Sequence, residues 1–108
     1  MIYHLAKPED WEKALRKGTY RTPSLSSEGF IHLSTQAQLM ESARRFFSLE
    51  QELVVLEIAE KNVKHLLKWE SAPDREELFP HIYGPIPLEL IADTFMLMKN
   101  SRGEWEKV

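Results

Sequence analysis

The sequence predicts a small α+β domain with a largely antiparallel, split sheet and two main helices. Three observations lead to this class. The chain has 108 residues, close to the commonest size of a single domain, and no repeat or linker divides it, so residues 1–108 are expected to form one domain. Strand-like and helix-like segments follow one another without regular βαβ alternation. Two segments carry the apolar spacing of amphipathic helices, and most of the others predict short strands.

The composition is typical of a folded, soluble protein. Apolar residues make up 43% of the chain and charged residues 29%, which is the composition of a globular chain and not of a disordered one. The chain has no cysteine, which fits a reducing compartment, and it begins with no secretory leader, so we expect a cytoplasmic protein. Its apolar runs are too short to span a bilayer, so we expect no membrane partner. A net charge of −3 argues against a nucleic-acid partner, which needs an excess of basic side chains.

The first part of the chain predicts a strand, a helix and a loop. Residues 2–5 are apolar enough for a short strand. Pro8 then opens a helix whose first turn is acidic, and Gly18 ends it. Residues 19–27 contain a proline and three serines and predict a loop.

A second strand and helix follow. Residues 29–33 predict a buried strand that includes His32. Thr35 and Gln38 have the spacing of a capping box, which predicts a helix start. That helix carries apolar residues on one face, among them Leu39, Ala43 and Phe46.

The second half predicts mainly strands. Residues 53–59 are the clearest strand and residues 66–70 a short one, while residues 71–78 predict a surface loop. Three prolines and a glycine in residues 79–87 predict an irregular but stiff segment. Residues 88–98 predict a long strand, and the tail a final short one. The predicted core includes Trp11, Leu15, Leu39, Ala43, Phe46, Val55 and Ile58.

Histidines are the main candidates for function. Of the four in the chain, His4, His32 and His81 lie in apolar, strand-like contexts. A core histidine must find partners for its ring nitrogens, so each of them alone is explained by packing. Three in one small domain instead indicate a shared site, because histidines that converge can handle protons or bind anions. His65 lies in a charged stretch and has no predicted role.

Polar neighbours extend this predicted site. Ser34 lies two residues after His32, so on a strand the two side chains point to the same side. Thr35 precedes a helix N-terminus, where free N–H groups attract anions, although capping alone also explains it. Gly84 lets the backbone turn or approach a ligand closely. The candidate ligand-binding residues are His4, His32, Ser34, Thr35, His81, Tyr83 and Gly84.

Three functions agree with these residues. We expect a small anionic ligand, such as a nucleotide or dinucleotide, to bind in a histidine-lined cleft, with the catalytic residue unassigned. The alternative is a non-catalytic interaction module whose histidines are structural. A metal-dependent enzyme using the three histidines and Glu70 is weaker, because no pair has helical zinc-ligand spacing. No metal is predicted, and whether Glu70 joins the site is open.

Several motifs together resemble a bacterial family known as domain of unknown function 952. They are IYHLA at residues 2–6, GFIHLST at residues 29–35, KWE at residues 68–70 and FPHIYGPIP at residues 79–87. This resemblance covers essentially the whole chain. The family has no established substrate, so the resemblance implies a protein of unknown function.

The order of elements is also similar to that of the ADP-ribosyltransferase superfamily. There a first strand carries a histidine, as in Ile2-Tyr3-His4, and a later strand leads through hydroxyl residues into a helix, as in residues 30–35. This resemblance implies an NAD-like dinucleotide as ligand, with His4 on a ribose and Tyr3 or Tyr83 stacked on a ring. The transferases have a catalytic glutamate at the start of a late strand, whereas residues 80–83 carry no acid.

Overall fold

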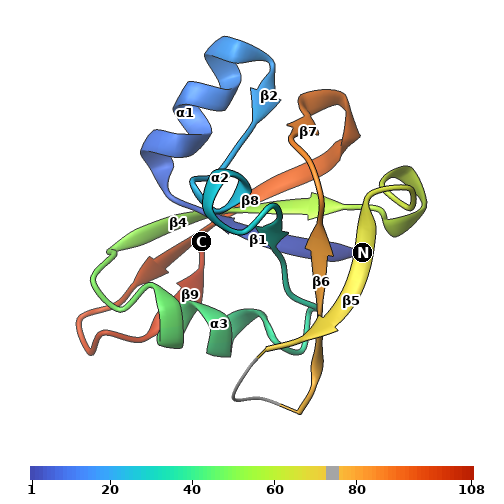
Figure 1. The fold of residues 1–108 in the computed structure, drawn as a ribbon. Coiled ribbons are helices and arrows are strands. Elements are labelled where there is room, and N and C mark those ends of the chain that lie inside the picture. Colours follow the sequence, from blue (N-terminus) through green and yellow to red (C-terminus); the bar gives the residue numbers. More distant parts are fainter. Residues whose placement is uncertain (73–75) are drawn as a thin grey trace.

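The computed structural model describes residues 1–72 and 76–108, and it shows a small α+β domain with mostly antiparallel strands and few helices (Figure 1). One sheet has four strands in the order β1-β4-β8-β9, a second has three in the order β3-β6-β5, and β2 pairs with β7. Neighbouring strands in all three sheets are antiparallel. The predicted fold class is therefore confirmed at this level.

The elements have the following bounds. The four-stranded sheet contains β1 (Ile2–Ala6), β4 (Glu52–Ile58), β8 (Ile91–Lys99) and β9 (Trp105–Lys107). The three-stranded sheet contains β3 (Ile31–His32), β6 (Leu78–Ile82) and β5 (Leu67–Ser71), and the short pair is β2 (Thr19–Tyr20) with β7 (Ile86–Pro87). The helices are α1 (Pro8–Lys17), α2 (Ser24–Ser27) and α3 (Leu39–Phe46), with 3₁₀ turns η1 (Glu60–Asn62) and η2 (Leu88–Leu90).

Both faces of the four-stranded sheet are covered. Alternate residues of β1 and β4 belong to two separate apolar clusters, so these strands are nearly continuous hydrophobic runs. The first cluster includes Ile31 and Ile82 from the three-stranded sheet. The second includes Leu39 and Ala43 from α3. The three-stranded sheet therefore packs one face on the core, and its other face carries the exposed His32 and the buried His81.

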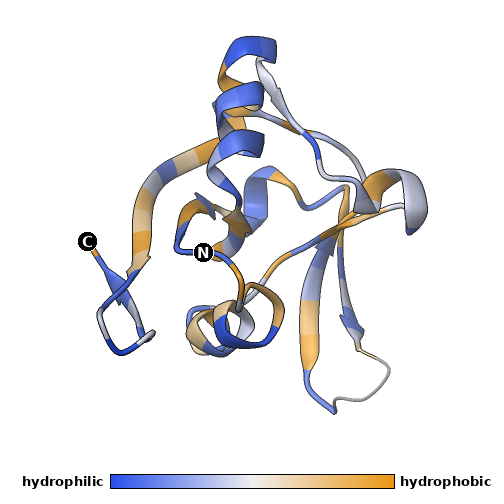
Figure 2. Ribbon diagram, turned by 90° about the vertical axis from the view of Figure 1, so that its left-hand side faces the viewer, coloured by the Kyte–Doolittle hydropathy of each residue, from blue (hydrophilic) through white to orange (hydrophobic). Residues whose placement is uncertain are grey.

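Helix α1 has the predicted ends but a narrower apolar face than predicted. Pro8 stands in its first turn, and Gly18 ends it with a left-handed φ of 79° and an N–H bond to the carbonyl of Ala14. Ala14 is buried and Trp11 is partly buried, whereas Leu15 is 55% exposed. The predicted core position of Leu15 is wrong, because the helix meets the core along a narrow face that includes Ala14. Figure 2 shows hydrophilic residues along most of α1, at the top of that view.

Helix α3 confirms the capping box and corrects its last turn. The Thr35 N–H donates to Gln38 Oε1 at 3.0 Å, and the Gln38 N–H donates to Thr35 Oγ1 at 3.2 Å. Regular helix begins only at Leu39. Phe46 is 63% exposed, so its predicted core position is wrong. The helix ends at Phe46, and the next residue, Phe47, packs against the second cluster instead.

The proline-rich segment also differs from the prediction. Residues 78–82 form a regular strand that pairs on both sides, with β3 and with β5. Pro80 is accommodated where the ladder with β3 ends, because its carbonyl accepts from Leu33 N–H at 2.9 Å and it has no N–H to return. In the same way, the loop predicted at residues 19–27 contains β2 and α2. Within the loop predicted at residues 71–78, residues 73–75 lie outside the described residues.

Phe46 and a buried leucine provide a test of this packing. Phe46→Ala should change the free energy of unfolding by less than about 1 kcal/mol, because the side chain already lies in solvent. Leu53→Ala, at a fully buried position, should cost about 2–5 kcal/mol. Urea denaturation of both variants measures the difference, and a loss for Phe46→Ala near that for Leu53→Ala would contradict the placement of α3.

Candidate functional site

Four aromatic rings make contact on the outer face of the three-stranded sheet. Phe30 stacks on His81 with ring centroids 4.2 Å apart and planes at 20°. It also contacts His32 at 4.8 Å and Tyr83 at 5.1 Å, and the two histidine rings meet edge to face at 5.2 Å. We call Phe30, His32, His81 and Tyr83 the ring cluster. Of the three residues expected in one site, His32, Ser34 and His81, the two histidines share this face, whereas the Ser34 hydroxyl lies against Ser42 of α3 and does not join the ring cluster.

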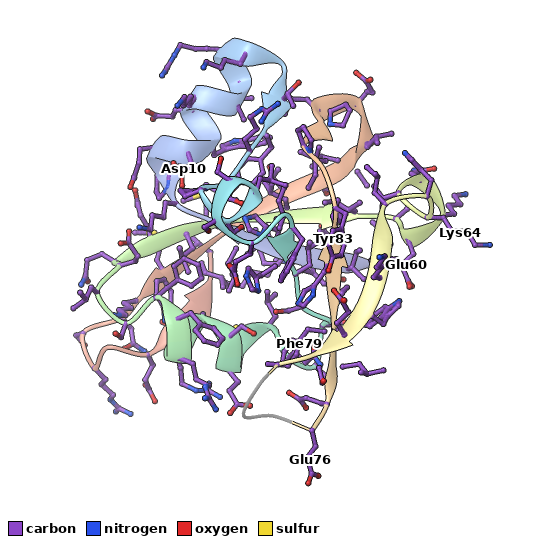
Figure 3. All side chains as sticks on the ribbon, viewed as in Figure 1. Asp10, Glu60, Lys64, Glu76, Phe79 and Tyr83 are labelled. Carbon is purple, nitrogen blue, oxygen red and sulfur yellow. The ribbon has the colours of Figure 1, made fainter. Side chains whose placement is uncertain are left out.

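Strand pairing explains why the rings converge. His32 of β3 lies directly opposite His81 of β6, and their neighbours Ile31 and Ile82 are also opposite each other and fully buried. Because side chains alternate along a strand, inward isoleucines require outward histidines. Tyr83 follows two residues after His81 and continues the same face; Figure 3 labels Tyr83 beside β6.

A glutamate from the neighbouring strand completes this group. Glu70 Oε1 accepts a hydrogen bond from Tyr83 Oη at 2.6 Å and another from His81 Nδ1 at 2.8 Å. The bond from Tyr83, and to a smaller extent the bond from His81, hold the pKa of Glu70 below its usual value. The hydrogen bond to the carboxylate in turn raises the pKa of the Tyr83 phenol. Glu70 is therefore ionised at neutral pH. The sequence left its participation open, and the structure places it in contact with the ring cluster.

Two further charged residues border the ring cluster. Glu28 Oε2 lies 2.9 Å from His32 Nε2, and both side chains are about half exposed. Lys68 Nζ lies 4.8 Å from the centre of the Tyr83 ring, in a cation–π arrangement. The border thus carries both signs of charge: a cationic head at Tyr83 and a carboxylate at His32.

His4 is placed differently from the other two histidines. Its ring is buried, Nδ1 lies 2.7 Å from the carbonyl oxygen of His32, and Nε2 lies 2.7 Å from Tyr20 Oη. A carbonyl only accepts, so Nδ1 carries the hydrogen and Nε2 accepts from the tyrosine. Burial lowers the pKa of His4 to about 4, which keeps the ring neutral. Both nitrogens are occupied, so the geometry is that of a histidine satisfied inside the core.

The remaining predicted residues have other contacts. Ser34 is buried, its hydroxyl lies 2.9 Å from that of Ser42 on α3, and its backbone bridges to Tyr3 of β1. Thr35 is engaged in the capping box. Gly84 does not have a positive φ, and a Cβ there would lie 3.4 Å from Leu66 Cδ1. The backbone conformation at Gly84 therefore does not require a glycine. The side chain nearest to Gly84 is the apolar one of Leu66.

Sequence reasoning missed Phe30 and Glu28. Phe30 lies two residues before His32, so the strand alternation used for Ser34 also applies to it. Glu28 lies four residues before His32 and bonds to it. The left-handed Gly29 between them, with φ of 90°, turns the chain after α2 so that both can reach His32. The alternation is visible in the sequence, whereas the turn at Gly29 is not.

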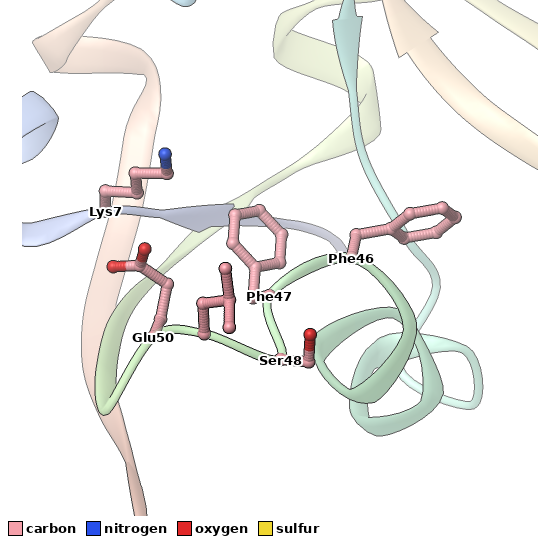
Figure 4. A pocket seen from close by; sticks show the side chains of 6 residues that line it. Lys7, Phe46, Phe47, Ser48 and Glu50 are labelled. Atoms are coloured by element: carbon pink, nitrogen blue, oxygen red, sulfur yellow. The ribbon is translucent and has the colours of Figure 1, made fainter.

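The described chain also has a pocket away from the ring cluster. This pocket of about 190 Å³ lies between the end of α3 and Lys7, lined also by Phe46, Phe47, Ser48, Leu49 and Glu50 (Figure 4). None of the predicted site residues lines it. Among the described residues, no three histidine or acidic side chains converge as metal ligands would, and no described helix is long and apolar enough to cross a membrane.

The fold and the ring cluster define a small α+β domain with paired histidines on a three-stranded sheet. The chain belongs to the family described as protein of unknown function (DUF952), whose model matches residues 5–94. The crystal structure of protein CC0527 from Caulobacter crescentus is similar, with a TM-score of 0.86 and 27% identity over 97% of this chain and 92% of that one. The solution structure of the same protein has a TM-score of 0.82 and 28% identity over 95% of this chain and 89% of that one. No curated protein matches significantly.

Burial of His4 predicts a pH-dependent stability. Its pKa is about 4 in the folded chain and 6.5 when unfolded, so the unfolded chain binds more protons between these values and stability falls as the pH is lowered. The contribution of His4 should decrease by about 2 kcal/mol from pH 7 to pH 5. Urea denaturation of wild type and His4→Gln at both pH values tests this.

The matched control is His65→Gln, because His65 is exposed. His65→Gln should keep the wild-type loss of stability at pH 5, whereas His4→Gln should start less stable at pH 7 and lose about 2 kcal/mol less. Equal pH dependence in wild type and His4→Gln would show that His4 is not buried in its neutral form.

Proposed function

We propose that the ring cluster binds a small anionic ligand of the nucleotide or dinucleotide class. The observation that supports this most is the contact of four rings on one outer face, two of them imidazoles. Aromatic faces stack on nucleobases, and such stacking tolerates many bases. Lys68, beside Tyr83, supplies a cation for phosphate, and an imidazole contributes hydrogen-bond donors.

Glu70 supports a transferase-like reaction on such a ligand. Both hydrogen bonds to its carboxylate go to Oε1, and Oε2 has no hydrogen-bond partner among the described residues. An ionised oxygen in this position can accept from ribose hydroxyls and stabilise positive charge that develops at a glycosidic carbon. The resemblance to ADP-ribosyltransferases makes an NAD-like dinucleotide the first ligand to test. β6 carries no acid at the comparable position, and we propose that Glu70 of β5 supplies one.

A non-catalytic interaction module is the second candidate. The arrangement of His4 favours it, because one histidine of the predicted site is already satisfied inside the core. If His32 and His81 are structural in the same sense, their replacement should lower stability by roughly 1–3 kcal/mol without changing any ligand affinity. If they belong to a binding site, affinity should change and stability should not.

Binding is tested by a thermal-shift screen of nucleotides and NAD, followed by calorimetric titration. A nucleotide at about 100 times its dissociation constant should add nearly 3 kcal/mol of stability. Phe30→Ala should weaken binding roughly tenfold through lost stacking, and Glu70→Gln roughly tenfold through a lost charge-assisted bond. No stabilisation by any nucleotide or dinucleotide would overturn the proposed function.

Trp69→Ala is the matched control for Phe30→Ala. Trp69 is an exposed aromatic residue on β5, next to Glu70 in sequence. It lies opposite Pro80, which faces the core, whereas the next residue of β6, His81, faces outward. Its side chain therefore points to the other face of the strand. Trp69→Ala should leave the nucleotide dissociation constant within about twofold. A tenfold change would place the ligand on the wrong side of the sheet for the ring cluster.

A further inference from the structure

We propose that His81 is a general base, oriented by Glu70, and that the ring cluster is therefore catalytic. This inference rests on the proposed function, because the bound nucleotide is its substrate. The proposed function does not say which residue transfers a proton, and this inference assigns that role to His81.

The contacts of His81 fix which of its nitrogens is free. Glu70 is ionised and can only accept, so His81 Nδ1 must donate the hydrogen across their 2.8 Å contact. In the neutral ring Nε2 then carries a lone pair. Nε2 has no hydrogen-bond partner among the described residues, and it is not among their fully enclosed unpartnered atoms. His81 thus presents an unoccupied proton acceptor.

The ring is also held in place. Phe30 covers one face of it at 4.2 Å, and the side chain is only 8% exposed. Tyr83 Oη bonds the same oxygen of Glu70, which fixes the carboxylate that orients the imidazole. A base that is itself oriented by a third group is the arrangement that activates hydroxyl groups in many hydrolases and transferases.

His32 does not offer the same arrangement. Its Nε2 contacts Glu28, but both side chains are about half exposed, so water competes for each of them. Among the described residues, the charged and titratable groups around His81 are Glu70, Tyr83, Lys68 at the cross-strand position, and His32 with Glu28. Of these, Glu70 is the group in direct hydrogen-bond contact, and it can stabilise the imidazolium that forms.

The proposed step is hydrolysis of the glycosidic bond of a bound nucleotide. The O–H bond of a water molecule breaks, and its proton goes to His81 Nε2. The water oxygen forms a bond to the glycosidic carbon, and the bond from that carbon to the base breaks with its electron pair leaving on the base. The departing base takes a proton from solvent, and the imidazolium of His81 releases to solvent the proton that it took from the attacking water. The products are a free base and a ribose phosphate, and His81 is neutral again.

Turnover is measured with a nucleotide that binds, at saturating concentration, by chromatography of the released base. His81→Gln should lower kcat by roughly 10²–10⁴-fold, and Glu70→Gln should lower it as well because the charge opposite the imidazolium is lost. His65→Gln, at an exposed histidine outside the site, should leave kcat unchanged. Binding without release of base by wild type, or full turnover by His81→Gln, would overturn the general base and leave the proposed binding function intact.

A measurement on the wild-type chain does not depend on how the variants fold. Nitrogen NMR of ¹⁵N-labelled histidine reports which ring nitrogen carries the hydrogen. His81 should be the Nδ1–H tautomer, with Nε2 unprotonated in the neutral ring. An Nε2–H tautomer would overturn the assignment. Absence of nucleotide binding would overturn the proposed function first, and the general base with it.

Discussion

The two hydrogen bonds of His4 are the interaction on which the position of the site depends. Its ring joins β1 to the carbonyl of His32 in β3 and to the phenol of Tyr20 in β2. β3 contributes only two residues to its ladder with β6, and the residues after it are held by the bond from Leu33 to Pro80 and by the bridge between Ser34 and Tyr3. The bond from His4 therefore helps to fix the backbone from which the His32 ring emerges. A buried polar ring with either nitrogen unpaired would cost roughly 1–3 kcal/mol, which makes this geometry specific.

The same strand of the three-stranded sheet serves the core and the site. In β6, Pro80 and Ile82 are buried in the core, while His81, and Tyr83 just after the strand, belong to the ring cluster. Because side chains alternate, anchoring the inward residues also fixes the outward ones. Groups carried by a packed strand are held more precisely than groups on loops, so the His81 ring has a defined orientation.

Strand register decides which charge meets the histidine. In the ladder of β5 and β6, Lys68 lies opposite His81 and Glu70 lies opposite Phe79. Glu70 reaches His81 diagonally, and its Oε1 also receives the Tyr83 hydroxyl. A shift of this ladder by one residue would turn Glu70 to the opposite face of the sheet. The carboxylate–histidine contact is thus a consequence of sheet assembly.

The sequence by itself determined the features that depend on neighbouring residues. Pro8 and Gly18 mark the ends of α1, Thr35 and Gln38 form their capping box, and residues 53–59 predict β4 almost to its ends, because each of these involves groups only a few positions apart. Alternation after His32 predicted a shared face with Ser34, which is instead buried against Ser42 of α3, and the meeting of His32 with His81 follows from strand register. Local patterns could not place Leu15 or Phe46, since exposure depends on which face of a helix meets another layer.

Only the tertiary structure decided the roles of the polar groups. The partners of His4 lie 16 and 28 residues away along the chain, and those of Glu70 lie 11 and 13 away. Such distances mean that the partner is set by the register and packing of whole strands, which no local pattern encodes. For this reason His4, predicted to face a ligand, is enclosed in the core, whereas Glu70, left open by the sequence, stands beside His81.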